Sequence, residues 1–528
     1  EMKTSPALLL VVLLVVLPLL DAAKILMYDY KFQRSHVQFI NTVAEILVDE
    51  GHDVVMLSNV LDGNLRDEGT NRVRRYFIEQ SAEAEAVSFS SMGSNHWKSR
   101  GFYDWLKSFE MRKMAASMSG QCVAMLHDHH LIDQLSQEEF DVALTTPNDK
   151  CIYYVFFKAG ISNYAVIDSH STLLSSFQYS GIPDQLSTVP GRFSSCAEMN
   201  FSCRLKNFLI DTSMTLIPLF VRSDLRDRIE ATFENAPQLH ELMANVSMVF
   251  LNRIPAMDFP SLTTHTTVDI GGITTSSGNK SLNEHWSSIL SLRPRTILIS
   301  FGTIALSSDM PEEYKKSILQ AIQSFPNVTF ICKYEKPDDR ISEGIDNLIE
   351  ASFTPQKEIL QDPRVSLFIT HCGWASTLET MIAGVPAIAI PISTDQHRNA
   401  QVMKRGGGAI VMNKKELVNS EALVRNIKQI LENESYRSSS RRTASVIANS
   451  PYSGRENFLR NLDFLIKFGP LPNLRIPSHK QSFVEYHMID VYALISAVPL
   501  IAVYFIYTIL KSIVRSVLRV GVRKTKKE

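Results

Sequence analysis

The residues best suited to chemistry lie in one run, residues 368–396, with the sequence FITHCGWASTLETMIAGVPAIAIPISTDQ. An apolar strand is expected to end at Thr370, after which His371 and Gly373 form a tight turn into a helix that opens near Ala375. The free N–H groups and the positive dipole end of such a helix bind anions. A histidine at the strand tip can donate a hydrogen bond to a phosphate oxygen, so the run predicts a phosphate-binding turn.

Two further groups in this run suit a sugar. Glu379, about two helical turns beyond the turn, can accept hydrogen bonds from a pair of hydroxyl groups. Asp395 and Gln396 follow the next apolar strand and can hydrogen-bond a second polar part of the same ligand. A strand-tip histidine alone is more often satisfied by a backbone carbonyl, so the prediction depends on these features together.

The run matches the signature of the UDP-glycosyltransferase superfamily position for position, at Thr370, His371, Gly373, Ser376, Glu379, Pro386, Pro391, Asp395 and Gln396. Ser300-Phe301-Gly302-Thr303 resembles the phosphate-side loop of that family, and Phe353-Thr354-Pro355-Gln356 resembles its uracil-stacking segment. The whole layout is similar to that of the animal UDP-glucuronosyltransferases. The resemblance implies donor binding by Ser300, Gly302, Thr303, Phe353, Gln356, His371, Gly373, Ser376, Glu379, Asp395 and Gln396.

The same resemblance implies an α/β fold of the GT-B type, in which two doubly wound Rossmann-like domains face a cleft and one transmembrane helix follows them. The first domain would bind the acceptor and the second the UDP-sugar, a co-substrate; neither a cofactor nor a metal is expected. Transfer would invert the anomeric carbon, as a base takes the acceptor's hydroxyl proton, the oxygen attacks and UDP leaves. His36 matches the family's base position, and an imidazole with an ordinary pKa suits this task.

Three residues depart from the family pattern. Thr146 occupies the place of the acid that usually holds the imidazole, and Asp149 is the nearest substitute, so His36 and Asp149 are the predicted catalytic residues. Loss of an orienting carboxylate can lower the rate by orders of magnitude. Ala375 stands where many relatives carry an asparagine that reaches the donor, and Phe353 stands where a tryptophan commonly stacks on uracil.

Three functions stay open. The first is transfer of glucuronic acid from UDP-glucuronate to hydroxyl groups of small lipophilic acceptors, a detoxification reaction. The second uses UDP-glucose on the same fold, because no residue reads the sugar carboxylate unambiguously. The third is a catalytically weak homologue that binds nucleotide sugar, which Thr146 and Ala375 favour and the intact His36 and His371 disfavour. A homo- or hetero-oligomer is compatible with all three.

These residues must be positioned by a parallel sheet in each half of the chain. Short apolar, β-branched runs alternate with helical stretches, which indicates helices on both faces of parallel sheets. Strands are expected at residues 24–28, 54–57, 142–145, 165–167 and 248–251, and again at 296–300, 328–332, 365–370, 387–390 and 409–411. A Thr/Gly/Ser-rich stretch near residues 263–281 separates the two series. We therefore expect domains over residues 24–280 and 281–488, with the ligand at the carboxyl ends of the strands.

The two ends of the chain are hydrophobic. Residues 1–23 have the layout of a signal peptide, with an uncleaved anchor as the alternative. A transmembrane helix is expected over residues 489–510, followed by a basic tail over residues 511–528. The Lys- and Arg-rich tail is expected in the cytosol, which predicts a single-pass type I protein of the endoplasmic reticulum with lumenal catalytic domains. Lys524 and Lys526 resemble a dilysine retrieval signal, and a basic tail that contacts anionic lipid is the alternative.

Composition and charge exclude several other classes. The 54 Lys and Arg residues balance 55 Asp and Glu residues, so no global field gathers nucleic acid, and no nucleic-acid partner is expected. The six cysteines are too few for a disulfide scaffold and lack zinc-site spacing. Five N-x-S/T sequons, which predict a glycoprotein, agree with a lumenal location, at Asn200, Asn245, Asn279, Asn327 and Asn433.

Two clusters outside the signature have plain structural interpretations. His127, Asp128, His129 and His130 could suggest a metal site, but a solvated helix end explains them better. The second cluster is aromatic and predicts core or membrane-surface packing, with an acceptor pocket as the alternative, at Trp97, Phe102, Tyr103, Trp105 and Phe109.

Overall fold

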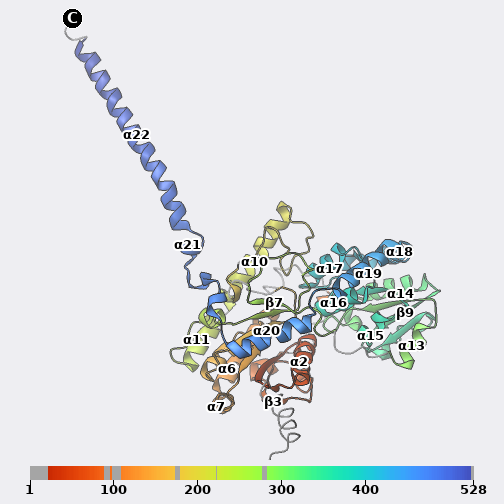
Figure 1. Ribbon diagram of the computed structural model, residues 1–528. Helices are drawn as coiled ribbons and strands as arrows, with labels where there is room; N and C mark the ends of the chain where they lie inside the picture. The colour runs from red at the N-terminus through yellow and green to blue at the C-terminus, as the bar shows by residue number, and fades with distance from the viewer. Residues whose placement is uncertain are drawn as a thin grey trace, which may run out of the picture. The chain divides into compact units, whose positions relative to one another are not determined.

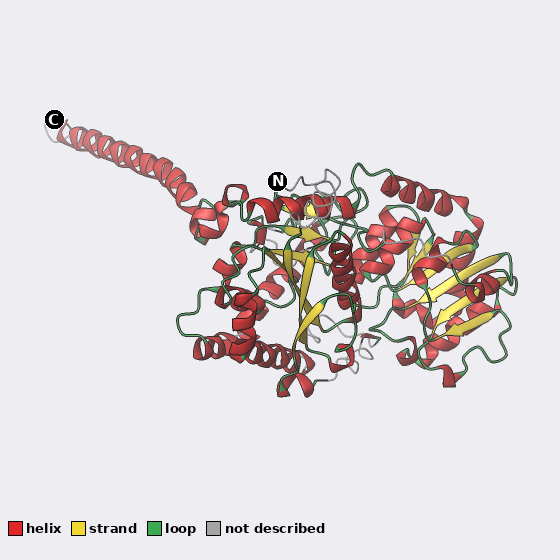
Figure 2. Ribbon diagram, turned by 60° about the horizontal axis from the view of Figure 1, so that its bottom comes forward, coloured by secondary structure: helices red, strands yellow, loops and turns green. Residues whose placement is uncertain are grey.

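The computed structural model describes residues 22–87, 96–97, 109–172, 179–182, 184–221, 223–275 and 282–524 of the 528-residue chain. The predicted signal segment therefore lies almost wholly outside the described residues. By its internal contacts the chain divides into two units, Glu1–Arg475 and Ile476–Glu528 (Figure 1). The first unit holds two separate sheets, each flanked by helices (Figure 2).

The first sheet has seven parallel strands in the order β3-β2-β1-β4-β5-β6-β7. Its strands are β1 (Lys24–Lys31), β2 (Asp53–Val60), β3 (Arg74–Ile78), β4 (Val142–Thr145), β5 (Tyr164–Asp168), β6 (Val249–Leu251) and β7 (Thr267–Asp269). Its helices are α2 (Arg34–Asp49), α3 (Ala82–Glu85), α6 (Phe109–His127), α7 (His129–Gln137), α8 (Ile152–Lys158), α10 (Phe201–Val221), α11 (Ser223–Thr232) and α12 (Leu239–Ala244). Strand order reverses between β1 and β4, which is where such folds bind ligands.

The second sheet has six parallel strands in the order β10-β9-β8-β11-β12-β13, which repeats the winding of the first. Its strands are β8 (Arg295–Ser300), β9 (Val328–Lys333), β10 (Leu348–Ala351), β11 (Val365–Thr370), β12 (Ala387–Ala389) and β13 (Ala409–Val411). Its helices are α13 (Glu284–Leu290), α14 (Glu312–Gln323), α15 (Gln356–Gln361), α16 (Trp374–Ala383), α17 (Gln396–Arg405), α18 (Ser420–Glu432) and α19 (Glu434–Ala448). The two doubly wound domains predicted from the alternation of strands and helices are confirmed.

The three strands that the apolar pattern did not predict are β3, β7 and β10, and each is an edge strand. Strands in the middle of a parallel sheet are covered on both faces and read as continuous apolar runs. The edge strands are only partly covered, and β3 with the sequence RRYFI exposes its first residue and buries only its last. Local sequence therefore marks every central strand and misses three of the four edge strands, since only β13 was predicted at an edge.

One helix of the C-terminal half belongs to the core of the first sheet. Helix α20 (Gly454–Phe468) buries Phe458, Leu462 and Leu465 completely, in the cluster that also contains residues of β1, β4 and β5. The Phe458 ring lies 5.0 Å from the ring of Phe250 in β6. The range 281–488 predicted for the second domain therefore includes a helix that covers the first sheet, because its apolar stripe matches that surface.

Trp97 lies in the range predicted for the first domain but packs in the core of the second. It is buried there, and its ring lies 5.2 Å from the ring of Phe301. Its indole Nε1 donates to the carbonyl of Leu306 at 2.8 Å. Trp97 thus has the core-packing role that the sequence favoured. Phe102, Tyr103, Trp105 and the side chain of Phe109 lie outside the described residues.

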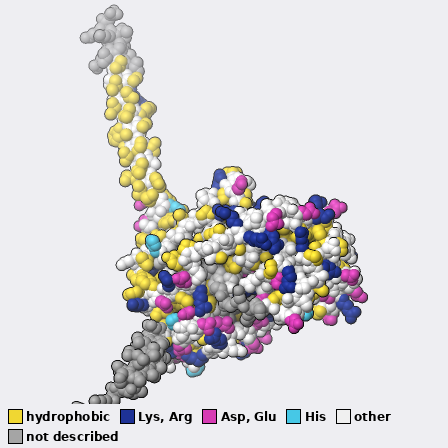
Figure 3. All heavy atoms as spheres, turned by 45° about the vertical axis from the view of Figure 1, so that its right-hand side comes forward, with side chains coloured by type: hydrophobic (Ala, Val, Ile, Leu, Met, Phe, Trp, Pro, Cys, Tyr) yellow, Lys and Arg dark blue, Asp and Glu magenta, His cyan; other side chains and the backbone are white. Residues whose placement is uncertain are grey.

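The second unit contains the short helix α21 (Phe483–Tyr486) and the long helix α22 (Ile489–Lys524). Within α22, Ile489–Val517 is long and apolar enough to cross a membrane, with a mean hydropathy of 2.2 over its most apolar window and no part of that window buried. Hydrophobic side chains cover the visible face of this helix (Figure 3). The helix continues past the predicted boundary at Leu510 into the basic segment, because Lys and Arg are good helix formers.

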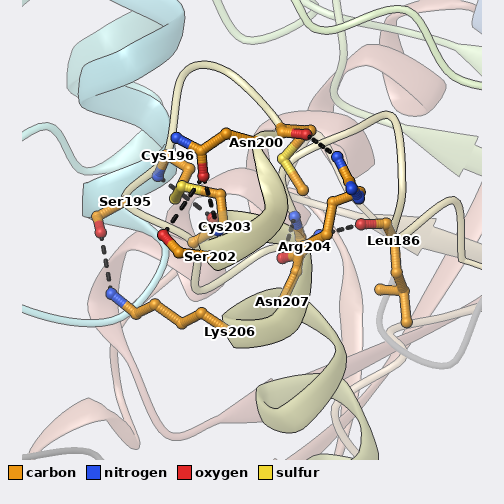
Figure 4. The surroundings of a disulfide bond; sticks show 12 residues. Leu186, Ser195, Cys196, Asn200, Ser202, Cys203, Arg204, Lys206 and Asn207 are labelled. Carbon is orange, nitrogen blue, oxygen red and sulfur yellow. Dashed lines mark hydrogen bonds between the residues drawn. A yellow bond between two sulfur atoms is a disulfide. The ribbon is translucent and has the colours of Figure 1, made fainter.

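Two disulfides stabilise loops of the first unit, a pairing that the sequence left open. Cys122 in α6 bonds to Cys151 at the start of α8, and Cys196 bonds to Cys203 in α10. Figure 4 shows the second bond, with the side-chain oxygen of Asn200 accepting a hydrogen bond from the Cys203 amide at 3.0 Å. The remaining cysteines, Cys332 and Cys372, are free and buried.

Candidate active site

The signature residues lie where the strand order of the second sheet reverses. Ser300 ends β8 and pairs with Thr370 at the end of β11, so the two predicted loops start side by side. After Thr370 the chain turns through Cys372, whose φ of +65° is unusual for a residue with a side chain. Two hydrogen bonds hold this turn: the Cys372 amide donates to Thr370 Oγ1 at 3.2 Å, and Asn399 Nδ2 donates to the Cys372 carbonyl at 3.0 Å.

The ring of His371 fills the space between two glycines. Its Nε2 atom lies 2.4 Å from the position that a Cβ on Gly302 would take, and 2.6 Å from the corresponding position on Gly373. Any side chain at either glycine would collide with the ring. Burial lowers the pKa of His371 to about 4, although Asp395 opposes the shift, so the ring is neutral at physiological pH. Among the described residues its buried Nδ1 atom has no hydrogen-bond partner.

Helix α16 begins directly after this histidine. Its N-cap residue is Gly373, and no side chain caps the helix, which leaves the first N–H groups of a ten-residue helix free for a ligand. Lys333, at the end of β9, donates from Nζ to the Gly302 carbonyl at 2.9 Å and pairs with Glu335 at 2.7 Å. The sequence analysis did not single out Lys333, although its place at a strand end next to β8 was a usable signal. The turn combines a neutral imidazole, a helix N-terminus and a nearby cation.

Three predicted donor residues form a hydrogen-bonded group. Gln356 Nε2 donates to Ser376 Oγ at 2.9 Å and to Glu379 Oε2 at 2.6 Å. Burial raises the pKa of Glu379 to about 7, and the bond from Gln356 and the charge of Lys357 only partly oppose the shift. The acid can therefore be an acceptor or a donor near neutral pH.

Two predicted donor residues are open to solvent. Phe353 is 74% exposed and therefore free to stack against a flat ligand. Thr303 is also exposed, in the loop that follows β8.

Asp395 is the N-cap of α17 and Gln396 is its first residue, and their side chains have different roles. Gln396 accepts hydrogen bonds from the amides of Ile392 and Ser393 at 2.8 and 3.0 Å, so its side-chain oxygen shapes the loop. Burial raises the pKa of Asp395, but the charges of His170 and Arg192 and two hydrogen bonds outweigh burial, and the net pKa is low. Asp395 is thus an ionised acceptor within electrostatic range of residues from the first domain.

His36 lies in the first turn of α2, where the first strand leads into its helix. It is buried, its ring lies 5.0 Å from that of Phe32, and its Nδ1 atom faces Ser169 Oγ at 3.0 Å and Asn148 Nδ2 at 3.3 Å. Burial and then the charge of His170 lower the pKa of His36 to about 3. The predicted base is therefore a neutral imidazole with two neutral partners.

Asp149 does not hold the imidazole of His36, contrary to its expected role as the substitute acid. Its carboxylate accepts hydrogen bonds from the Tyr28 hydroxyl, from Asn59 Nδ2 at 3.2 Å and from the Cys151 amide at 2.8 Å. The turn after β4 points Asp149 into this buried polar network and presents its neighbour Asn148 to His36. Thr146 is buried, and its hydroxyl has no partner among the described residues.

Residues after β5 complete this side of the site, and the sequence analysis missed them. Asp168 is buried at the end of the strand, and its Oδ1 atom lies 2.8 Å from Nδ1 of His170. The His170 ring lies 4.9 Å from the His36 ring. A strand was expected at residues 165–167, so an acid and a histidine directly after it were a signal that could have been followed.

Direct hydrogen bonds join the two domains beside these residues. Trp374 in α16 donates from Nε1 to the carbonyl of Asn252 at 2.6 Å. Arg398 in α17 is buried and pairs with Asp258 at 2.6 Å, and it donates to the carbonyl of Pro190 at 3.1 Å and to Ser171 Oγ at 3.1 Å. These contacts fix the first domain against the second.

The described residues contain no group of three or more His, Cys, Asp or Glu side chains that could hold a metal ion. His127, His129 and His130 are exposed where α6 meets α7. Asp128 caps α7 by accepting from the Leu131 amide at 2.9 Å. This cluster is the solvated helix end that the sequence favoured.

The two Rossmann-like domains, with the tight glycine-lined turn before α16, define a GT-B glycosyltransferase fold. Two solved glycosyltransferase structures have the same fold. The glycotransferase of kitacinnamycin superimposes with a TM-score of 0.57 at 12% identity, covering 84% of this chain and 98% of that one. A UGT2 of Phytolacca americana, solved with UDP-2-fluoro-glucose and pterostilbene, gives 0.55 at 16% identity, covering 84% and 100%.

The family assignment follows from sequence. The model of the UDP-glucuronosyl and UDP-glucosyl transferase family matches residues 23–525, so the chain belongs to this family and is a UDP-glycosyltransferase. Human UDP-glucuronosyltransferase 1A1 is 25% identical over 464 residues, which cover 87% of this chain and 86% of that one. The Caenorhabditis elegans protein ugt-50, a candidate UDP-glucuronosyltransferase, is 26% identical over 503 residues, covering 92% and 93%.

Proposed function

We propose that this chain is a membrane-bound UDP-glucuronosyltransferase that moves glucuronic acid from UDP-glucuronate to hydroxyl groups of small lipophilic acceptors, with inversion. The observation that carries the proposal is the placement of His371 between Gly302 and Gly373 at the open N-terminus of α16. This arrangement fits a diphosphate, because free N–H groups, a helix dipole and an imidazole donor point at one anion.

The donor is held along the strand ends of the second domain. Phe353 stacks on the uracil, the Gln356–Glu379 pair binds the ribose hydroxyls, and Ser300, Thr303 and the α16 terminus bind the diphosphate. Asp395 and the Gln396 amide bind the sugar. As UDP leaves, negative charge grows on the diphosphate, and preorganised donors stabilise that charge without reorganising.

The acceptor side supplies the base. His36 takes the hydroxyl proton, the acceptor oxygen forms its bond to the anomeric carbon, and the bond from that carbon to the diphosphate oxygen breaks, with the electron pair leaving on UDP. Positioned bases of this kind contribute about 10²- to 10⁴-fold in rate. His36→Ala is expected to lower kcat within that range and to leave UDP binding intact.

One cation supports glucuronate over glucose as the proposed donor. Arg192 donates from Nη1 to the carbonyl of Thr172 at 3.4 Å, and its charge lowers the pKa of both Asp168 and Asp395. A guanidinium pairs well with a carboxylate, and the glucuronate ring carries one where glucose does not. Transfer of glucose is the second candidate, and a weak homologue that only binds nucleotide sugar is the third, kept open by Thr146 and Ala375.

A location in the membrane of the endoplasmic reticulum, with lumenal catalytic domains, belongs to the same proposal. Its support is the apolar helix α22, the two disulfides, which persist in oxidising compartments, and sequons in exposed positions. Asn200, Asn245, Asn327 and Asn433 are all exposed, whereas Asn279 lies outside the described residues. A mobility shift on endoglycosidase H treatment of the expressed chain tests this orientation, and resistance at all sequons would contradict it.

The function is tested with a donor panel. The full chain is expressed in microsomes, which are permeabilised and given a phenol or steroid acceptor with UDP-glucuronate or UDP-glucose, and products are identified by mass. A glucuronide supports the proposal, and a glucoside alone would assign the second candidate. UDP binding without any conjugate, across a wide acceptor panel, would favour the third.

A further inference from the structure

On the first-domain side, the described part of the site contains two imidazoles, His36 and His170, and only His170, which was not predicted, makes a hydrogen bond to a carboxylate. His170 Nδ1 lies 2.8 Å from Oδ1 of Asp168, and the His170 amide donates to the same oxygen at 3.0 Å. His36 has Ser169 Oγ and the Asn148 amide as its hydrogen-bond partners, and both are neutral. The carboxylate–imidazole pair that His36 lacks therefore exists at the end of β5, between Asp168, its last residue, and His170, two residues further on.

Asp168 is suited to hold an imidazole in one orientation. It is completely buried, and although burial raises its pKa, hydrogen bonds from the His170 side chain and amide and the charge of Arg192 oppose burial, and the net pKa is low. An ionised carboxylate can only accept a hydrogen bond, so Nδ1 of His170 carries the hydrogen in this pair. That tautomer leaves the lone pair on Nε2, which is the nitrogen that a base uses in a carboxylate–histidine pair.

His170 also lies on the side where transfer must take place. Its ring is 4.9 Å from the ring of His36, and its side chain is 15% exposed, whereas the carboxylate behind it is inaccessible. His170 also lies within electrostatic range of Asp395, the predicted sugar ligand of the other domain. Among the described residues, the charged or titratable groups that share an electrostatic influence with this ring include His36, Asp168 and Asp395, and Arg192 acts on the same three groups.

We infer that His170, held by Asp168, is a second catalytic base of the transferase. The Asp168–His170 pair supplies the carboxylate–imidazole contact that His36 lacks, because Thr146 stands where an acid is expected. The inference rests on the proposed function for the reaction and its donor, and it reassigns one step: the proton given there to His36 goes first to His170. The acceptor hydroxyl gives this proton to Nε2 of His170, its oxygen bonds to the anomeric carbon, and the carbon–diphosphate bond breaks with its electrons on UDP. Asp168 stabilises the resulting imidazolium, while His36, 4.9 Å away, hydrogen-bonds the same hydroxyl and takes over when His170 is missing.

The local fold allows the charge of Asp168 to be removed without disturbing the turn. The hydrogen bond from the His170 amide to Oδ1 is an Asx-type turn, which an asparagine forms equally well. Asp168→Asn therefore keeps the backbone geometry and removes only the negative charge. His170→Gln keeps a polar side chain of similar length and removes the proton acceptor.

The experiment measures kcat and KM for the UDP-sugar in microsomes containing the full chain, for Asp168→Asn, His170→Gln, His36→Ala and the double variant His36→Ala/His170→Gln. The expected result is a loss of about 100-fold or more in kcat for Asp168→Asn and His170→Gln, with KM for the donor within about threefold of wild type. His36→Ala is expected to retain residual activity that the double variant loses. His129→Gln, an exposed histidine on α7, is the matched control and should match wild type.

Two further measurements separate a catalytic from a structural role. UDP binding by each solubilised variant reports folding, and added imidazole should restore part of the kcat of His170→Ala, which a structural defect would not allow. Wild-type kcat in His170→Gln and Asp168→Asn, with transfer intact in the parent chain, would overturn the inference alone. Absence of transfer by the parent chain from either donor would overturn the proposed function as well.

Discussion

At the scale of single residues, the candidate site depends on two glycines, Gly302 and Gly373, which leave room for the ring of His371. His371 occupies the space that two Cβ atoms would need, and the left-handed φ of +86° at Gly302 brings its backbone against the ring. The imidazole is thereby fixed beside the α16 terminus without a hydrogen bond to its Nδ1 among the described residues.

Gly302→Ala is expected to weaken donor binding at least tenfold, because the new methyl group would displace the His371 ring. Gly344→Ala is the matched control: Gly344 has a similar φ of +77°, but nothing lies within 4 Å of its Cβ position. Both variants should lose about 1–2 kcal/mol of stability from the left-handed backbone. Equilibrium binding of UDP separates the two effects, and equal affinity in both variants would contradict the role of the His371 ring.

Glu379 should make donor binding depend on pH near neutrality. Its pKa is raised to about 7 by burial, so the ionised form, which accepts from ribose hydroxyls, becomes dominant as pH rises through 7. KM for the UDP-sugar is expected to fall between pH 6 and about 8 in wild type, and to change much less in Glu379→Gln. Glu421→Gln, on an exposed face of α18, serves as the control.

The same carboxyl group gives a stability effect with a defined sign. The folded chain keeps a proton on Glu379 above pH 4.5, its ordinary pKa, where the unfolded chain has already released it. The free energy of unfolding therefore falls as pH rises from about 4.5 to about 7, and Glu379→Gln should flatten that part of the profile. Thermal unfolding at several pH values measures this slope.

At the scale of elements, each functional group sits where a strand ends or a helix begins. His36 lies in the first turn of α2, His371 directly before α16 and Asp395 at the start of α17, because doubly wound sheets gather these ends at one edge. Helix α17 connects the strand ends of the two sheets, because its Arg398 donates to the carbonyl of Pro190 and to Asp258 in loops of the first domain. The arginine also lies 5.3 Å from the centre of the Phe259 ring.

Arg398→Met should therefore destabilise the first unit by about 3–5 kcal/mol, because it leaves Asp258 buried without its counter-charge. Arg425→Met is the control, since Arg425 is 68% exposed and its carboxylate partner lies 4.0 Å away; a loss below about 0.5 kcal/mol is expected. Chemical denaturation of the solubilised chains gives both values. Equal stability of the two variants would argue that Arg398 does not connect the domains energetically.

At the scale of the whole molecule, the division into Glu1–Arg475 and Ile476–Glu528 separates a catalytic body from the apolar helix. The body includes α20, which packs on the first sheet, and ends at Arg475, which donates to the carbonyl of Asn245 at 2.7 Å. The natural limit of the body therefore lies after α20.

A chain that ends at Arg475 is expected to fold and to stay in the soluble fraction. A chain that ends at Ser453 should not, because it loses the buried side chains of Phe458, Leu462 and Leu465, each worth about 2–5 kcal/mol. UDP binding and solubility of the two truncated chains test this difference. A soluble, UDP-binding chain ending at Ser453 would show that α20 is dispensable.

The sequence by itself determined the two doubly wound domains, the tight turn from His371 into a helix and the apolar helix near the C-terminus. Each is a local pattern: central strands read as apolar runs, the turn and its helix are contiguous in sequence, and a long uncharged stretch needs no partner to be recognised. The edge strands β3, β7 and β10 were not predicted, because strands that are only partly covered do not form continuous apolar runs.

Only the tertiary structure decided which groups meet. It turned Asp149 toward Tyr28, brought Asp168 and His170 beside His36, and returned α20 to the first sheet. These contacts join residues tens to hundreds of positions apart. Their formation depends on how complete sheets pack and on which way a turn points its side chains, and neither is encoded in the spacing of residues along one segment.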